Sequence, residues 1–123
     1  MKALSIRQPW LYLILIRVKR LENRSWSTDY RGPIALHAPK IVGNVEQIME
    51  RYRIFIPPHL PTGGLVGVAD IVDVITESDD LFFDGPYAFV LGNVRILPFV
   101  AIDGQQRLFD LPDKLKLPRG YRQ

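Results

Sequence analysis

The sequence contains no cysteine, which excludes disulfides and thiolate metal sites. Its only histidines, His37 and His59, lie far apart and lack the spacing of a ligand pair, so we predict no metal site and no cofactor. The most apolar run, 11–16, is far too short to span a bilayer. A Gly-x-Ser-x-Gly elbow is absent, and Gly63-Gly64 lacks the lysine and hydroxyl residue of a phosphate loop, which argues against a serine hydrolase or a nucleoside triphosphatase.

The composition is that of one globular domain. A chain of 123 residues, 47% hydrophobic and 24% charged, suffices for a single core. The net charge of +3 permits binding to an anion such as nucleic acid without requiring it. No secretory signal follows Met1, so we expect a soluble, cytoplasmic protein that has no membrane partner.

Hydrophobic patterning predicts five or six short strands and two or three helices. The strands are expected over 2–7, 21–26, 33–38, 65–75, 87–91 and 94–99, and the helices over 9–19, 45–53 and 105–111. Asn44 is the expected N-cap of the second helix, and Gly92-Asn93 predicts a hairpin between the last two strands. Because the elements do not alternate as βαβ units and the strands contain glycines, we predict an α+β protein, a small β-barrel with packed helices. The domain is expected to cover 1–112, followed by a basic tail over 113–123.

A dense charged group follows the first predicted helix. Side chains alternate along a strand, so Glu22, Arg24 and Trp26 are expected on one face, and Lys19 lies close enough upstream to reach it. Such a group can hold a phosphate, hydrogen-bond a base edge and stack on its ring, with Tyr87 as a further stacking candidate. The alternatives are a structural ion-pair cluster and core or rim aromatics.

A second group lies where the first strand turns into the helix. Ser5, Arg7, Gln8 and Trp10 are expected near the positive end of the helix dipole, where anions bind favourably. The Gln8 amide can both donate to and accept from a base, whereas simple core packing is the alternative for Trp10. His37 lies in an apolar strand and is expected to be a hydrogen-bonded core residue rather than a catalytic one.

The spacing Lys19-x-x-Glu22-x-Arg24 resembles the ASCH domain family, whose hallmark is Gly-x-Lys-x-x-Glu-x-Arg; here Arg17 stands where that glycine is expected. The chain looks like the small prokaryotic single-domain members. The resemblance extends to about Pro112 and includes the segments 5–10, 22–26, 30–33, 37–38, 85–91 and 108–110.

The resemblance implies a PUA-like barrel with a cleft lined by the motif, and a role in binding RNA or a modified nucleoside. Some members are similar to amidohydrolases that deacetylate N4-acetylcytidine, and others are described as ribonucleases. In the amidohydrolases a threonine nucleophile stands where this chain has Glu22, beside a lysine that matches Lys19, so their mechanism does not transfer intact. We therefore predict a nucleic-acid-binding domain. The alternative is a metal-independent hydrolase acting on RNA or an acylated nucleoside, with Lys19 and Glu22 as acid/base partners, and the sequence leaves open whether the protein is an enzyme.

Overall fold

Six strands and two helices form in the computed structural model, which describes residues 1–115 and 117. The strands are β1 (Lys2–Ser5), β2 (Leu21–Arg24), β3 (Gly32–Ala38), β4 (Gly64–Ile75), β5 (Tyr87–Ala101) and β6 (Leu108–Asp110). The helices are α1 (Trp10–Leu15) and α2 (Val45–Tyr52). The predicted cap of α2 is confirmed, because the Asn44 side chain accepts a hydrogen bond from the Gln47 N–H at 3.0 Å.

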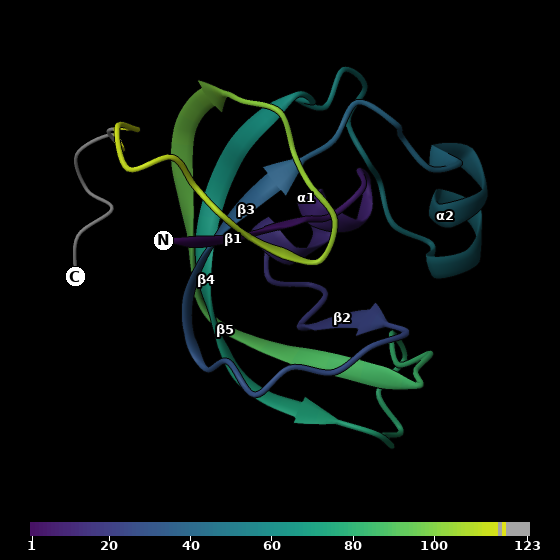
Figure 1. Ribbon diagram of the computed structural model, residues 1–123. Helices are drawn as coiled ribbons and strands as arrows, with labels where there is room; N and C mark the ends of the chain where they lie inside the picture. The colour runs from purple at the N-terminus through teal and green to yellow at the C-terminus, as the bar shows by residue number, and fades with distance from the viewer. Residues whose placement is uncertain (116, 118–123) are drawn as a thin grey trace.

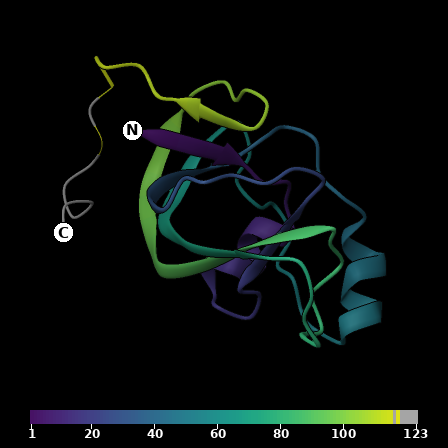
Figure 2. The same cartoon turned by 60° about the horizontal axis from the view of Figure 1, so that its bottom comes forward.

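The strands form one sheet in the order β2-β5-β4-β3-β1-β6. Neighbouring strands are antiparallel except β1 and β3, which are parallel. The sheet curls around α1, and α2 packs outside the curl (Figures 1 and 2). This arrangement confirms the predicted α+β fold, a small PUA-like barrel with packed helices.

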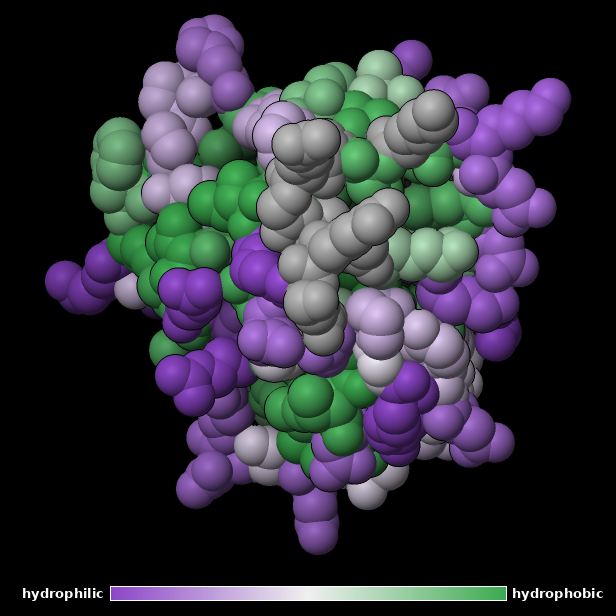
Figure 3. Space-filling model, turned by 90° about the vertical axis from the view of Figure 1, so that its left-hand side faces the viewer, coloured by the Kyte–Doolittle hydropathy of each residue, from purple (hydrophilic) through white to green (hydrophobic). Residues whose placement is uncertain are grey.

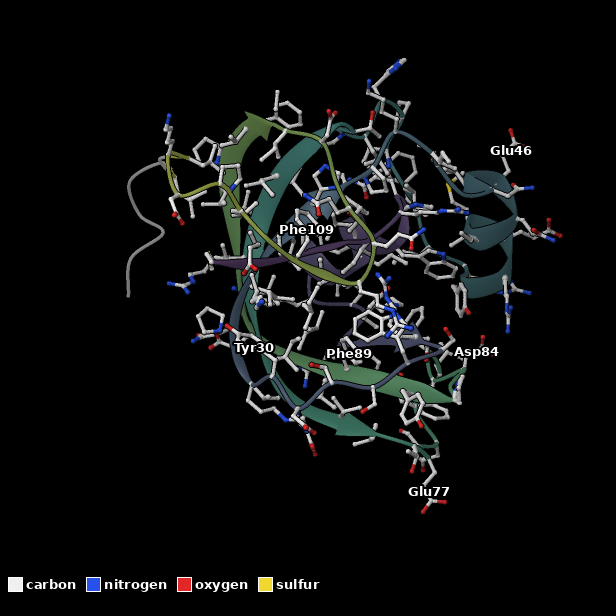
Figure 4. The ribbon with its side chains drawn as sticks, in the orientation of Figure 1. Tyr30, Glu46, Glu77, Asp84, Phe89 and Phe109 are labelled. Atoms are coloured by element: carbon white, nitrogen blue, oxygen red, sulfur yellow. The ribbon has the colours of Figure 1, made fainter. Side chains whose placement is uncertain are left out.

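The main core fills the space between α1 and the concave face of the sheet. Leu11 and Ile14 of α1 are fully buried there with Phe89 of β5, which Figure 4 shows on the inner side of the curl. Gly67 of β4 permits this close approach, because a Cβ at that position would lie 2.6 Å from Leu15 Cδ2. The helix therefore packs onto the sheet at a point where only glycine fits.

The first helix is shorter than the predicted 9–19, because it ends at Leu15. Arg17 adopts a left-handed conformation with φ of 64°, and the Lys19 N–H donates to the Leu13 carbonyl, so the chain turns away from the helix axis. Arg17 occupies the place of the family's glycine, which is the residue that favours this conformation. Its guanidinium donates to the Val94 carbonyl at 2.7 Å and holds the turn against β5.

The predicted hairpin at Gly92-Asn93 is wrong. Both halves of β5 pair with the same strand, β4, and the pairing steps from Asp70–Gly92 to Val68–Arg95. Asn93, with φ of 55°, belongs to this irregularity, in which β5 has one residue more than β4. The turn-forming pair therefore bends a continuous strand instead of ending it.

The predicted helix over 105–111 is also wrong, because its second half is β6. Ala3 pairs with Phe109, and the Phe109 side chain is buried. The N–H and C=O groups at the edge of β1 need partners, and β6 supplies them.

The predicted tail over 113–123 lies mainly outside the described residues. Its described part packs on the domain, since Leu115 and Leu117 contact a core cluster that includes Leu65 and Phe109. On the face to the left in Figure 1, apolar and polar surface alternate (Figure 3). Neither helix formed by the described residues has the length and apolar character needed to cross a bilayer.

Candidate ligand-binding site

Glu22 of β2 lies between two cations. Its Oε1 accepts from the Lys19 ammonium at 3.1 Å, and its Oε2 accepts from Arg24 Nε at 3.1 Å and lies 3.0 Å from Arg24 Nη2. Glu22 and Arg24 are two residues apart on a strand, so both side chains extend from the same face. The turn at Arg17 brings Lys19 to that face from the loop that follows α1.

The three charged groups are largely withdrawn from water. The side chains of Lys19, Glu22 and Arg24 are 4%, 11% and 20% exposed. Lys19 also donates to the Leu21 carbonyl, and its Nζ lies 5.7 Å from the centre of the Trp10 ring. A buried charge needs a partner and hydrogen bonds, so the carboxylate holds both cations in place.

A first cavity of about 270 Å³ opens on the Lys19 side of this group. We call it the aromatic cavity, and it is lined by Trp10, Lys19, Glu22, Asn23, Arg51, Tyr52, Leu81, Phe82, Phe83 and Asp84. Its wall combines β2, the end of α2 and the loop before β5. Two cations and two carboxylates line it, so its formal charges balance.

Asn23 holds the loop that forms one wall of the aromatic cavity. Its side-chain amide donates to the Phe82 carbonyl at 2.8 Å, and its Oδ1 accepts from the N–H groups of Asp84 and Gly85 at 2.8 and 3.1 Å. Figure 4 shows Asp84 beside the end of β2.

A second cavity of about 520 Å³ lies on the Arg24 side. We call it the arginine cavity, and it is lined by Ser5, Ile6, Arg7, Trp10, Glu22, Arg24, Ser25, Trp26, Pro39, Gln105, Gln106 and Arg107. The Arg107 guanidinium lies 5.1 Å from the centre of the Trp26 ring, which packs edge-on against Phe89. Trp10 and Glu22 line both cavities, so the two hollows adjoin at these residues.

Several predicted site residues are engaged elsewhere. Both ends of the buried Gln8 amide are used, since it donates to the Pro61 carbonyl and accepts from the Tyr12 N–H. With only six residues, α1 also gives little of the dipole expected to attract an anion beside it. Tyr87 pairs with Arg24 in the sheet and lines neither cavity.

Ser5 lines the arginine cavity, but its hydroxyl contacts His37 Nδ1 at 2.8 Å. His37 Nε2 lies 2.8 Å from the Ile102 carbonyl, which can only accept, so Nε2 carries a proton; in the neutral ring Nδ1 then accepts from Ser5. This agrees with a hydrogen-bonded core histidine. Across residues 1–115 and 117, no group of three His, Asp or Glu side chains could hold a metal ion.

Sequence reasoning missed most of the residues that α2 and the loops contribute. These are Arg51, Tyr52, Leu81, Phe82, Phe83 and Asp84 in the aromatic cavity, and Ser25, Pro39, Gln105, Gln106 and Arg107 in the arginine cavity. Arg107 lies in the segment 105–111, which was predicted to be a helix, and nothing in that sequence indicated a binding residue. Only the curl of the sheet brings 105–107 next to β2.

Similarity to known proteins includes the region of this charged group. A family model described as ASCH domain matches residues 4–84, which contain the Lys19, Glu22 and Arg24 group. The chain is 28% identical over 132 residues to human activating signal cointegrator 1, covering 92% of this chain and 22% of that protein. It is 31% identical over 84 residues to the mouse protein of the same name, covering 61% of this chain and 14% of that protein. The chain thus spans about a fifth or less of the curated relatives it matches.

Proposed function

Because this chain belongs to the ASCH domain family, we propose that it binds nucleic acid, RNA or a modified nucleoside in particular, through its two adjoining cavities. One observation carries the proposal: the Glu22 carboxylate holds an ammonium and a guanidinium at the wall that both cavities share. Cations can form charge-assisted hydrogen bonds with the phosphate, and the bases can stack on aromatic rings. The role that the family resemblance implies agrees with this geometry.

The charged residues of the two cavities suit different parts of a nucleotide. Arg7 and Arg24 are suited to phosphate, since a guanidinium can make two parallel hydrogen bonds to it. Lys19 has three N–H donors, of which two go to Leu21 and Glu22, so one remains for a ligand in the aromatic cavity. Glu22 can accept a proton donor of a base edge through its remaining lone pairs.

The test is fluorescence anisotropy with a labelled short single-stranded RNA. We expect Lys19→Ala to weaken binding, because it removes the ammonium donor that faces the aromatic cavity. A phosphate contact carries no sequence information, so loss of the Arg7 guanidinium should weaken binding about equally for all sequences. Arg7→Gln is a second variant that leaves the fold intact, because Arg7 is exposed. Lys40→Ala, an exposed lysine that lines neither cavity, is the matched control. Unchanged affinity in both Lys19→Ala and Arg7→Gln rejects the site.

A hydrolase is the second candidate, because Lys19 Nζ and Glu22 Oε1 are 3.1 Å apart, a distance over which a proton can pass. Such an enzyme would cleave RNA or an acylated nucleoside, such as N4-acetylcytidine, without a metal. The expected result is product formation in the presence of a chelator and its loss in Glu22→Gln under conditions where circular dichroism shows that variant to be folded. If chromatography detects no product from either substrate, this candidate is rejected and binding alone remains.

A further inference from the structure

We infer that the two cavities are separate subsites for one nucleotide, with the base in the aromatic cavity and its phosphate in the arginine cavity. The inference rests on the proposed function and extends it, because it assigns each part of the ligand to a set of residues. The division follows from three features. One cavity has aromatic rings and nearly balanced charges, the other has two guanidiniums with no acceptor among the described residues, and two residues line both cavities.

The aromatic cavity suits a flat, uncharged ring with polar edges. Trp10, Tyr52, Phe82 and Phe83 line it, and Trp10 and Tyr52 pack edge to face with centroids 5.9 Å apart. Two cations, Lys19 and Arg51, and two carboxylates line it, so even with Glu22 shared with Arg24 its positive excess is smaller than that of the arginine cavity. Bases stack on aromatic side chains whatever their sequence.

The arginine cavity has an excess of positive charge. Its charged lining is Arg7, Arg24 and Arg107 against the single carboxylate of Glu22. That carboxylate is already bonded to Arg24. Among the described residues the guanidinium of neither Arg7 nor Arg107 forms a hydrogen bond or an ion pair, although that of Arg107 stacks on Trp26. Two guanidiniums without an acceptor beside a hollow of about 520 Å³ are suited to an anion such as phosphate.

The two subsites meet at Trp10 and Glu22, which line both cavities. A ligand that fills both cavities must pass over Trp10 and Glu22, which we call the ridge, and the sugar of a nucleotide would lie there. The Glu22 carboxylate disfavours a phosphate at the ridge and accepts from a hydroxyl, which keeps the phosphate on the arginine side. A free nucleoside should therefore use one cavity, and inorganic phosphate the other.

The experiment is an NMR titration of the whole chain with adenosine, its 3′- and 5′-monophosphates, and inorganic phosphate. Tyr52→Leu removes a ring from the aromatic cavity but keeps an apolar side chain, and Arg107→Gln removes an exposed guanidinium from the arginine cavity. Arg20→Gln, an exposed arginine that lines neither cavity, is the control. Circular dichroism confirms that each variant is folded.

We expect at least one monophosphate to bind more tightly than adenosine or phosphate alone. Tyr52→Leu should weaken adenosine and the monophosphate roughly tenfold and leave inorganic phosphate unchanged. Arg107→Gln should weaken the monophosphate and phosphate roughly tenfold and leave adenosine unchanged. The control should match the unmodified protein.

Other outcomes overturn the division. If Arg107→Gln weakens adenosine as much as the monophosphate, or if Tyr52→Leu changes neither, the cavities are not separate subsites. Failure of every monophosphate to bind also rejects it. If RNA binding depends on Lys19 in the anisotropy assay while this pattern is absent, the proposed function stands and only the division fails. If the pattern appears but the RNA does not bind, the division stands and RNA is the wrong ligand.

Discussion

Arg24 and Ser5 close the curled sheet, because Arg24 Nη2 donates a hydrogen bond to the Ser5 carbonyl. Arg24 lies on β2, the first strand of the sheet order, and Ser5 lies on β1, the fifth. Three strands separate them along the sheet, so the bond crosses the open side of the barrel. The same guanidinium is held by Glu22. The motif therefore stabilises the closure of the barrel as well as lining the cavities.

Arg24→Lys should destabilise the protein although it keeps the charge. A lysine ammonium lacks the planar fork that reaches Glu22 and the Ser5 carbonyl together. We expect a loss of about 1–3 kcal/mol in the free energy of unfolding, measured by urea denaturation. Arg20→Lys is the matched control and should change little, since Arg20 is exposed. Equal stabilities of the two variants would show that Arg24 does not fasten the barrel.

Glu22→Gln should have a larger effect on stability. The change leaves the Lys19 ammonium, which is 4% exposed, without its carboxylate partner. Breaking a buried ion pair from one side costs about 3–5 kcal/mol. Thermal and urea unfolding measure the loss, and Glu77→Gln, an exposed change outside the helices and strands, is the control. Adding Lys19→Met to Glu22→Gln should recover part of the stability, and simple additivity of the two changes would contradict the coupling.

The motif and the fold class were predictable because they rest on local pattern. Strand alternation places Glu22 and Arg24 on one face, and Asn44 caps its helix through a contact three residues away. The end of α1 was not predictable from the apolar residues alone, because these continue to Ile16 and again at Val18. The helix ends where Arg17 adopts a left-handed conformation. The conformation of one backbone residue outweighs the propensity of its neighbours there.

The cavities were less predictable, because their walls come from segments far apart in the chain. Asn23 bonds to Phe82 and Asp84 across about sixty positions, and no spacing rule signals such a contact. Gly92-Asn93 has the sequence of a hairpin turn, yet pairing with β4 on both sides makes it a bend within β5. Tertiary contacts override turn propensity in that case.

Gly67→Ala should destabilise the packing of α1 on the sheet. A Cβ there would lie 2.6 Å from Leu15 Cδ2 and 2.8 Å from the Arg95 carbonyl, which is backbone and cannot rotate away. Overpacking of this kind costs about 1–3 kcal/mol, which thermal unfolding measures. Gly43→Ala is the control, because its nearest contact would be an ordinary 3.5 Å. Adding Leu15→Ala should not restore full stability, since the clash with the Arg95 carbonyl remains.

Asn23→Asp should loosen the loop that walls the aromatic cavity. Aspartate keeps the oxygen that accepts from Asp84 and Gly85 but cannot donate to the Phe82 carbonyl, and it adds a negative charge beside Asp84. Hydrogen exchange of the amides of Asp84 and Gly85 should accelerate, while that of β4 should not. Gln47→Glu, at an exposed position of α2 that lines neither cavity, controls for the added charge. Unchanged exchange in the loop would show that other contacts hold it.

The salt dependence of RNA binding should report the guanidiniums of the arginine cavity. Each phosphate contact on a single strand contributes about 0.7 to the slope of log affinity against log salt concentration. Arg107→Gln should therefore lower that slope by about 0.7. Lys40→Gln, which removes an exposed charge outside both cavities, should leave the slope close to that of the unmodified protein. If both substitutions reduce the slope equally, the binding reflects general surface charge, and the arginine cavity has no special part in holding the phosphate.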